Sequence, residues 1–183
     1  MPHYNSREIT AIALFSGLWG VLNSIFSPIV FRMFGLPILC DMIGFALLSL
    51  TVWWVRKPGA ATLVGVIATV INFIFNPSGV FFLGFTAASI VFDIVAWLAT
   101  YDAYFKKTSL TVISLLSISV LSATIAGLII GTYFMATPAL VNWGGVLGWT
   151  GLHAVGGIIG GFIGMTLVTG LINRGLPRTD VKR

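Results

Sequence analysis

An aspartate stands inside an apolar run. In FTAASIVFDIVAWLAT, residues 85–100, every neighbour of Asp93 is apolar or small. Placing an ionised carboxylate at the centre of a membrane-inserted helix costs about 2.5–3.5 kcal/mol, so such acids usually face an interior cavity or a partner. Asp93 is therefore a neutral acid hydrogen-bonded to other helices, a partner of His153, or part of a ligand or proton site. We expect the ligand or proton site.

Other polar side chains recur at helical spacing. Steps of three and four residues put one set on a single helix face: Thr86, Ser89, Asp93 and Trp97. Two other apolar segments carry similar stripes, namely Thr69, Asn72 and Asn76 in one and Trp19, Asn23 and Ser27 in the other. We expect these faces to converge on one interior cavity, with Asp93 facing Thr69 and Asn72.

A further group of residues lies toward one side of the expected bundle. Asp41 either caps its helix or belongs to the cavity. Trp143 and Trp149 are typical of an interfacial aromatic belt, but beside an acid they also suit a stacking and cation–π site. With Asn142 and His153 they complete the expected substrate-binding set.

Motifs for catalysis are absent from the sequence. The glycine run GGIIGGFIGM has no lysine and so is not a phosphate-binding loop. His3 and His153 are the only histidines, and they form no H-E-x-x-H motif. We therefore expect neither an enzyme nor a metal or other cofactor.

The composition is that of an integral membrane protein. Of 183 residues, 57% are hydrophobic and 8% charged, against about 25% charged in soluble domains. Spanning a bilayer takes about 20 apolar residues per helix. A single all-α domain over 1–183 is predicted, with six transmembrane helices near 8–27, 36–55, 60–76, 80–101, 109–135 and 148–172.

The basic residues predict the orientation. Nine of the ten Lys and Arg residues fall on one side of these spans: Arg7, Arg56, Lys57, Lys106, Lys107, Arg174, Arg178, Lys182 and Arg183. Arg32 alone falls on the other side. Since basic loops stay in the cytoplasm, both termini are predicted to be cytoplasmic. The net charge of +5 thus reflects topology rather than a nucleic-acid partner.

Small residues four apart allow close helix approach. Gly156, Gly160 and Gly164 indicate tight internal packing of the last span. Ala13 and Gly17 in the first span form a face that either packs internally or docks another membrane subunit.

Two loop sequences carry a family resemblance. RKPGAA, residues 56–61, and NPSG, residues 76–79, separated by one short helix, resemble loops of the YkoE-type S components of energy-coupling factor (ECF) transporters. The acid of the fourth span followed by WLATYDAY is also similar, and the likeness is best over residues 37–107.

The resemblance implies a vitamin importer of a prokaryotic plasma membrane. An S component binds its ligand from outside, and a membrane coupling subunit of the EcfT type and two ATPase subunits drive delivery. The expected ligand is thiamine or its hydroxymethylpyrimidine precursor, and the expected docking face is Ala13 and Gly17. The third span has Asn72 and Asn76 where family members carry acids, which leaves open an uncharged pyrimidine or another small vitamin.

Two other functions stay open. A self-sufficient, proton-coupled secondary transporter would use Asp93 as its proton site, although no inverted repeat is visible in the sequence. A non-transport membrane scaffold would use the polar stripes only to join its helices.

Overall fold

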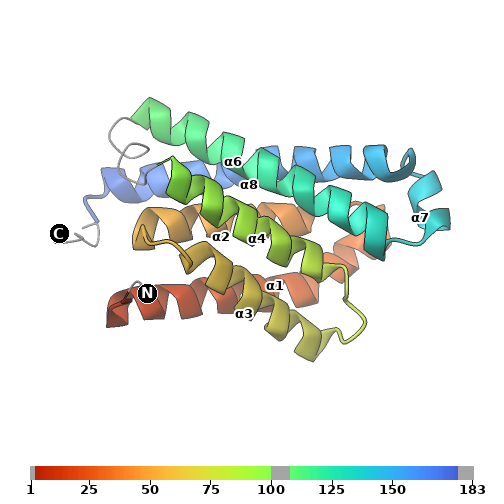
Figure 1. The fold of residues 1–183 in the computed structure, drawn as a ribbon, viewed down its shortest axis with the longest axis horizontal. Helices are drawn as coiled ribbons and strands as arrows, with labels where there is room; N and C mark the ends of the chain where they lie inside the picture. The colour runs from red at the N-terminus through yellow and green to blue at the C-terminus, as the bar shows by residue number, and fades with distance from the viewer. Residues whose placement is uncertain (1–2, 100–107, 177–183) are drawn as a thin grey trace.

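The computed structural model describes residues 3–99 and 108–176 and is an all-α bundle (Figure 1). Its long helices are α1 (Ser6–Phe34), α2 (Ile38–Val55), α3 (Ala60–Phe75), α4 (Phe82–Leu98), α6 (Thr108–Ile129) and α8 (Gly145–Asn173). The π-helix η1 (Ile130–Phe134) continues α6, and the short α7 (Thr137–Val141) leads into α8. The predicted all-α architecture is confirmed.

The helices have the length and composition of membrane spans. In the described residues, α1, α2, α6 with η1, and α8 are each long and apolar enough to cross a bilayer. The other two, α3 and α4, are apolar but have only 16 and 17 residues. At 1.5 Å per residue they reach about 25 Å, slightly less than the hydrocarbon core. The protein is a multi-pass membrane protein.

The first helix is longer than predicted. It was expected to end at residue 27, but it continues through Pro28 to Phe34 and closes on Gly35, whose φ is 69°. Proline has no N–H, so the carbonyl of Ser24 loses its helical donor. Asn76 Nδ2 lies 3.1 Å from that carbonyl and donates to it instead. A side chain of a neighbouring segment therefore keeps the helix intact past the proline.

Other boundaries differ less. The second helix begins at Ile38, the fourth at Phe82 and the last at Gly145, each within three residues of its predicted start. The predicted loop 136–147 contains the short helix α7.

Glycines of α8 bring it against two neighbours at once. A Cβ on Gly160 or Gly164 would lie 2.6 Å from an atom of α2, and one on Gly161 would lie 2.9 Å from Ser119 of α6. Gly156 likewise abuts Asp41 of α2. These contacts explain why α8 packs extensively on both α2 and α6, as the small-residue spacing predicted.

Both described ends of the chain lie at one end of the bundle, here called the terminal end (Figure 1). Arg7, Arg56, Lys57 and Arg174 flank the helix ends there, whereas Arg32 lies in the last turn of α1 at the opposite, distal end. The predicted count also used Lys106, Lys107, Arg178, Lys182 and Arg183, which lie outside the described residues. Which end faces the cytoplasm stays a prediction.

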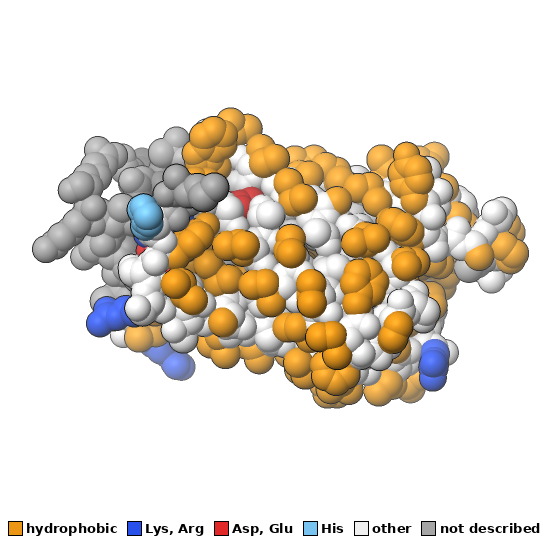
Figure 2. All heavy atoms as spheres, turned by 60° about the horizontal axis from the view of Figure 1, so that its bottom comes forward, with side chains coloured by type: hydrophobic (Ala, Val, Ile, Leu, Met, Phe, Trp, Pro, Cys, Tyr) orange, Lys and Arg blue, Asp and Glu red, His pale blue; other side chains and the backbone are white. Residues whose placement is uncertain are grey.

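The surface between the ends is apolar. On the face in Figure 2, hydrophobic side chains cover the middle, and the Lys and Arg side chains lie near the two ends. Large exposed apolar residues occur on α1, α3, α4, α6 and α8. This distribution suits a bundle surrounded by lipid.

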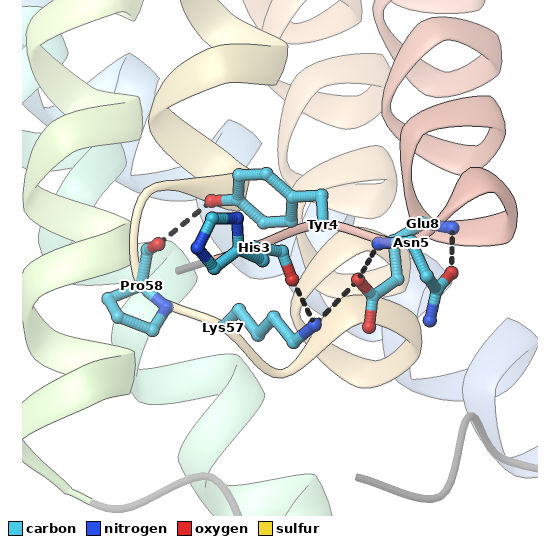
Figure 3. Close-up of polar contacts among 6 residues, drawn as sticks. All are labelled: His3, Tyr4, Asn5, Glu8, Lys57 and Pro58. Carbon is cyan, nitrogen blue, oxygen red and sulfur yellow. Dashed lines mark hydrogen bonds and ion pairs between the residues drawn. The ribbon is translucent and has the colours of Figure 1, made fainter. Parts of the chain in front are cut away.

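The start of α1 is tied to the loop between α2 and α3 (Figure 3). Asn5 and Glu8 form a capping box, and Lys57 Nζ donates to Glu8 Oε2 at 2.7 Å. The hydroxyl of Tyr4 donates to the carbonyl of Pro58 at 2.8 Å. RKPG is thus more than a basic loop, because its lysine and proline hold the N-terminal segment.

Candidate functional site

A cavity of about 260 Å³ opens at the distal end of the bundle. Residues of α1, α2, α3, α4, η1 and α8 and of the connecting loops line it. Its polar wall includes Asn23, Ser27, Asn72, Asn76, Ser78 and His153, and its aromatic wall consists of Phe31, Phe81, Phe85 and Trp149. A mostly apolar cavity with a few convergent polar groups is typical of a small-molecule site.

Three asparagines form one polar wall. The hydroxyl of Ser24 donates to the carbonyl of Gly20 at 2.5 Å and lies 3.1 Å from Asn72 Oδ1, and the hydroxyl of Ser27 donates to Asn23 Oδ1 at 2.7 Å. Asn76 is fixed by its bond to the carbonyl freed by Pro28. In the described part of the chain, Asn72 Nδ2 is buried without a hydrogen-bond partner. The amide wall is therefore rigid but retains an unused donor.

The opposite wall contains a buried acid–imidazole pair. Nδ1 of His153 lies 3.0 Å from Oδ1 of Asp41, and both side chains are at most 1% exposed. Gly156, one turn along α8 from His153, leaves room for the aspartate. Phe85 and Trp149 flank the imidazole with ring centroids 5.7 and 5.4 Å away. The ring is held by an acid on one side and by aromatic rings, and its Nε2 is buried without a partner among the described residues.

The structure brings together six of the predicted site residues. Asn23, Asn72, Asn76, Trp149 and His153 line the cavity, and Asp41 supports His153 from behind. Their convergence agrees with the expected meeting of polar faces.

Asp93 lies at a different place from the one expected. The sequence suggested a cavity acid facing Thr69 and Asn72, but Asp93 does not line the cavity. Its Oδ2 accepts from the backbone N–H and the hydroxyl of Thr62, at 3.1 and 2.8 Å. Thr62 lies in the first turn of α3, where backbone N–H groups lack helical acceptors. Asp93 therefore caps α3, and the partner of His153 is Asp41.

The other predicted residues of the Asp93 face also lie outside the cavity. Thr86 hydrogen-bonds Thr69 at 2.5 Å, and Ser89 packs on Gly65 while donating to the carbonyl of Thr86. Trp97 is 55% exposed on the lipid-facing surface. Thr86 and Ser89 therefore contact α3 across the α3–α4 interface.

Three further residues predicted for the site occupy other positions. Trp19 is fully buried against Gly44 and is not part of the cavity wall. Trp143 packs against Gly35, and Asn142 is exposed beside α7. Trp19 thus packs in the interior near the middle of α1, whereas Trp143 and Asn142 lie at the distal end, next to Gly35 and α7.

Sequence reasoning missed much of the aromatic wall. Phe81 and Phe85 are four residues apart, the spacing of one helix face, but in an apolar segment this spacing does not distinguish a cavity from lipid. Phe31 falls between the predicted spans 8–27 and 36–55, in a stretch that contains Pro28, and so was not expected on a helix. The sequence signal for this part of the wall was that the polar residues Asn23 and Ser27 continue up to Pro28.

Ala13 and Gly17 lie on a face of α1 that no described helix covers. Ala13 is exposed, and a Cβ added to Gly17 would meet nothing within 4 Å. Within the described residues, no group of three or more His, Cys, Asp or Glu side chains could hold a metal ion.

The fold is similar to that of a known protein. No protein-family model matches the chain, and no curated protein matches it. A solved structure described as the crystal structure of an S-component of an ECF transporter matches with a TM-score of 0.65 and 20% sequence identity. The match covers 95% of this chain and 88% of that chain. The chain thus has the fold of an ECF-transporter S-component along almost its entire length.

Proposed function

We propose that this chain is the substrate-binding subunit of an ECF-type importer for a vitamin or vitamin precursor. The observation that carries the proposal is the distal cavity within an S-component fold, whose lining residues combine aromatic rings with buried nitrogen atoms that have no partner among the described residues. A binding subunit of this kind carries out no chemistry itself, and ATP hydrolysis belongs to its partners.

The cavity suits one small, flat ligand. Phe31, Phe81, Phe85 and Trp149 supply aromatic surface, and the asparagines supply orienting hydrogen bonds. The volume of about 260 Å³ is near the lower limit for small-molecule sites. Thiamine and its hydroxymethylpyrimidine precursor are the first candidates, because RKPGAA and NPSG resemble loops of S components for these compounds. NPSG contributes Asn76, Ser78 and Gly79 to the cavity wall.

Delivery requires partners. We propose that an EcfT-type coupling subunit docks on the uncovered face of α1 at Ala13 and Gly17, and that two ATPase subunits drive the cycle. The cavity then opens to the outside of a prokaryotic plasma membrane, with the terminal end in the cytoplasm, in agreement with the basic residues there.

The test is ligand binding by the purified chain in detergent. Trp149 lies in the cavity wall, so a bound ligand is expected to quench its fluorescence. The panel contains thiamine, hydroxymethylpyrimidine, nicotinate, nicotinamide, riboflavin and biotin, with Trp149→Phe as the control for the signal. Saturable binding of one compound without partners or a proton gradient supports the proposal. Transport by the chain alone in proteoliposomes, driven by a proton gradient, would instead identify a secondary carrier.

A further inference from the structure

The charge and hydrogen-bonding character of the cavity restricts its ligand. Among the described lining residues there is no Asp or Glu, and the charged one is Arg32 at the mouth. The buried lining atoms without partners in this part of the chain are all nitrogens: Asn72 Nδ2, Trp149 Nε1 and His153 Nε2. An amide NH2 and an indole N–H can only donate. The asparagine and serine oxygens of the wall can accept. The state of the imidazole decides whether His153 adds a third donor or another acceptor.

Burial determines that state. A single uncompensated charge at membrane depth costs several kcal/mol, so the Asp41–His153 pair is most stable with zero net charge. Zero net charge is reached by a carboxylate with an imidazolium, or by a carboxylic acid with a neutral imidazole. In the second case the acid proton lies between Oδ1 and Nδ1, so the ring proton is on Nε2. Both of these arrangements leave a proton on Nε2. A proton on Oδ2 would instead leave Nε2 bare, but Oδ2 is buried without a partner among the described residues, so that arrangement would add a buried donor with no acceptor.

Contacts around the imidazole support this assignment. Phe85 from α4 and Trp149 from α8 flank the ring, and Gly127 of α6 packs on its Cβ. None of these groups is charged, and the other titratable side chains of the described cavity wall are Cys40 and Arg32. Neither supplies a negative charge at neutral pH that would replace Asp41.

We propose that the cavity binds a planar ligand that carries hydrogen-bond acceptors and no positive charge, and that the buried Asp41–His153 pair presents Nε2–H to it as a donor. The inference rests on the proposed function, and of its two first candidates it retains hydroxymethylpyrimidine and excludes thiamine, which is a cation. Asn72 and Trp149 supply further donors, and Arg32 at the mouth repels cations. Asp41 is a positioning residue, since it acts on the ligand only through the imidazole.

The protonation of Nε2 can be measured without a ligand. In ¹⁵N-histidine-labelled protein, the two ring nitrogens give shifts that separate protonated from bare nitrogen. His3→Gln leaves only the His153 signals, because the chain has two histidines. We expect Nε2 to be protonated at pH 7. A bare Nε2 with a protonated Nδ1 would overturn the proposal.

The ligand class is tested with matched pairs. Hydroxymethylpyrimidine is compared with thiamine, which carries the same pyrimidine on a cationic thiazolium, and nicotinamide is compared with cationic 1-methylnicotinamide. For a pair that binds, the uncharged member should bind at least about ten-fold more tightly. Equal or tighter binding of the cation rejects the ligand class and leaves the proposed function standing. If no vitamin or precursor binds, the proposed function fails and the ligand class falls with it, while the NMR result still decides the state of Nε2.

Two substitutions separate the roles of the two ring nitrogens of His153. The amide of His153→Gln reaches the position of Nε2 and can donate to a ligand, whereas that of His153→Asn reaches only Nδ1 and keeps the contact with Asp41. With both variants folded by size-exclusion profile, Gln should retain affinity within a few-fold, and Asn should lose about ten-fold or more. Unchanged affinity in the Asn variant, or equal losses in both, would overturn the role of Nε2.

Discussion

Asp41 Oδ1 on α2 and His153 Nδ1 on α8 lie 3.0 Å apart, in a fully buried contact between residues 112 positions apart in the chain. The contact joins the two helices that form one side of the cavity. It therefore serves both the packing of the bundle and the chemistry of the cavity wall.

The pair should show strong energetic coupling. His153→Leu leaves a buried carboxylate without its imidazole, and losses of about 3–5 kcal/mol are typical when one member of a buried pair is removed. Replacing both residues by leucine should recover most of the loss, because no uncompensated polar group remains. Reversible unfolding in mixed micelles of the single and double variants measures this coupling. Strictly additive losses would contradict it.

Gly156 is predicted to be required for the position of Asp41. An added Cβ would lie 2.6 Å from the Asp41 Cβ, so Gly156→Ala must push the aspartate away from His153. Overpacking of this kind costs about 1–3 kcal/mol. Gly170→Ala on the same helix is the matched control, since nothing lies within 4 Å of its Cβ and helix propensity should favour alanine by up to about 1 kcal/mol. Thermal unfolding of the two variants should move in opposite directions, and equal shifts would argue against the contact.

Asp93→Ala should lower stability without weakening ligand binding. Thr62 loses the acceptor of both its N–H and its hydroxyl, which costs about 1–3 kcal/mol when the donors stay buried. Thr62 and the cavity residue Asn76 are separated by almost the full length of α3, about 20 Å. The measurement is a binding titration beside a melting curve. A large loss of affinity in well-folded Asp93→Ala protein would return this acid to the site and strengthen the case for a carrier.

The architecture was predictable from the sequence, because a long apolar segment in a bilayer must pair its backbone N–H and C=O groups internally, and a helix does so. Helix existence and the close packing of Gly156, Gly160 and Gly164 followed from length and spacing alone. The end of α1 was predicted too early, at residue 27. Pro28 has no N–H to donate to the carbonyl of Ser24, but Asn76 donates to that carbonyl and the helix continues.

The site was only partly predictable, for a different reason. Polar residues on a helix face reveal that the face is interior, but not at which depth the cavity lies. Asn72 and Asp93 belong to faces that meet, yet the cavity reaches only the distal part of that seam. Asp41 was ambiguous because its partner lies on α8, and a pairing between such distant positions leaves no local pattern.

The contact of Tyr4 with the loop between α2 and α3 predicts a stability change at alkaline pH. Burial raises the pKa of the Tyr4 hydroxyl above its ordinary value of 10.0, with added contributions from the negative charges of Asp93 and Glu8. Because the folded state resists deprotonation, its stabilising effect is complete below pH 10 and is lost as the pH rises from there through the raised pKa. Melting curves from pH 8 to 11 should therefore fall more steeply for wild type than for Tyr4→Phe. Parallel curves would show that deprotonation of Tyr4 does not change the stability of the fold.

Docking of a coupling subunit can be separated from folding and from ligand binding at Gly17. A leucine side chain there enters open space, because nothing lies within 4 Å of the added Cβ, and the cavity is at the distal end of the bundle. Gly17→Leu should keep wild-type stability and ligand affinity but fail to copurify with the coupling subunit, since a bulky side chain prevents close approach of a second helix backbone. Gly151→Leu is the control, because it also enters open space but lies on α8. If both variants assemble normally, the coupling subunit docks on another face. If both fail to assemble, the loss comes from added bulk on the lipid-facing surface and not from a specific docking site on α1.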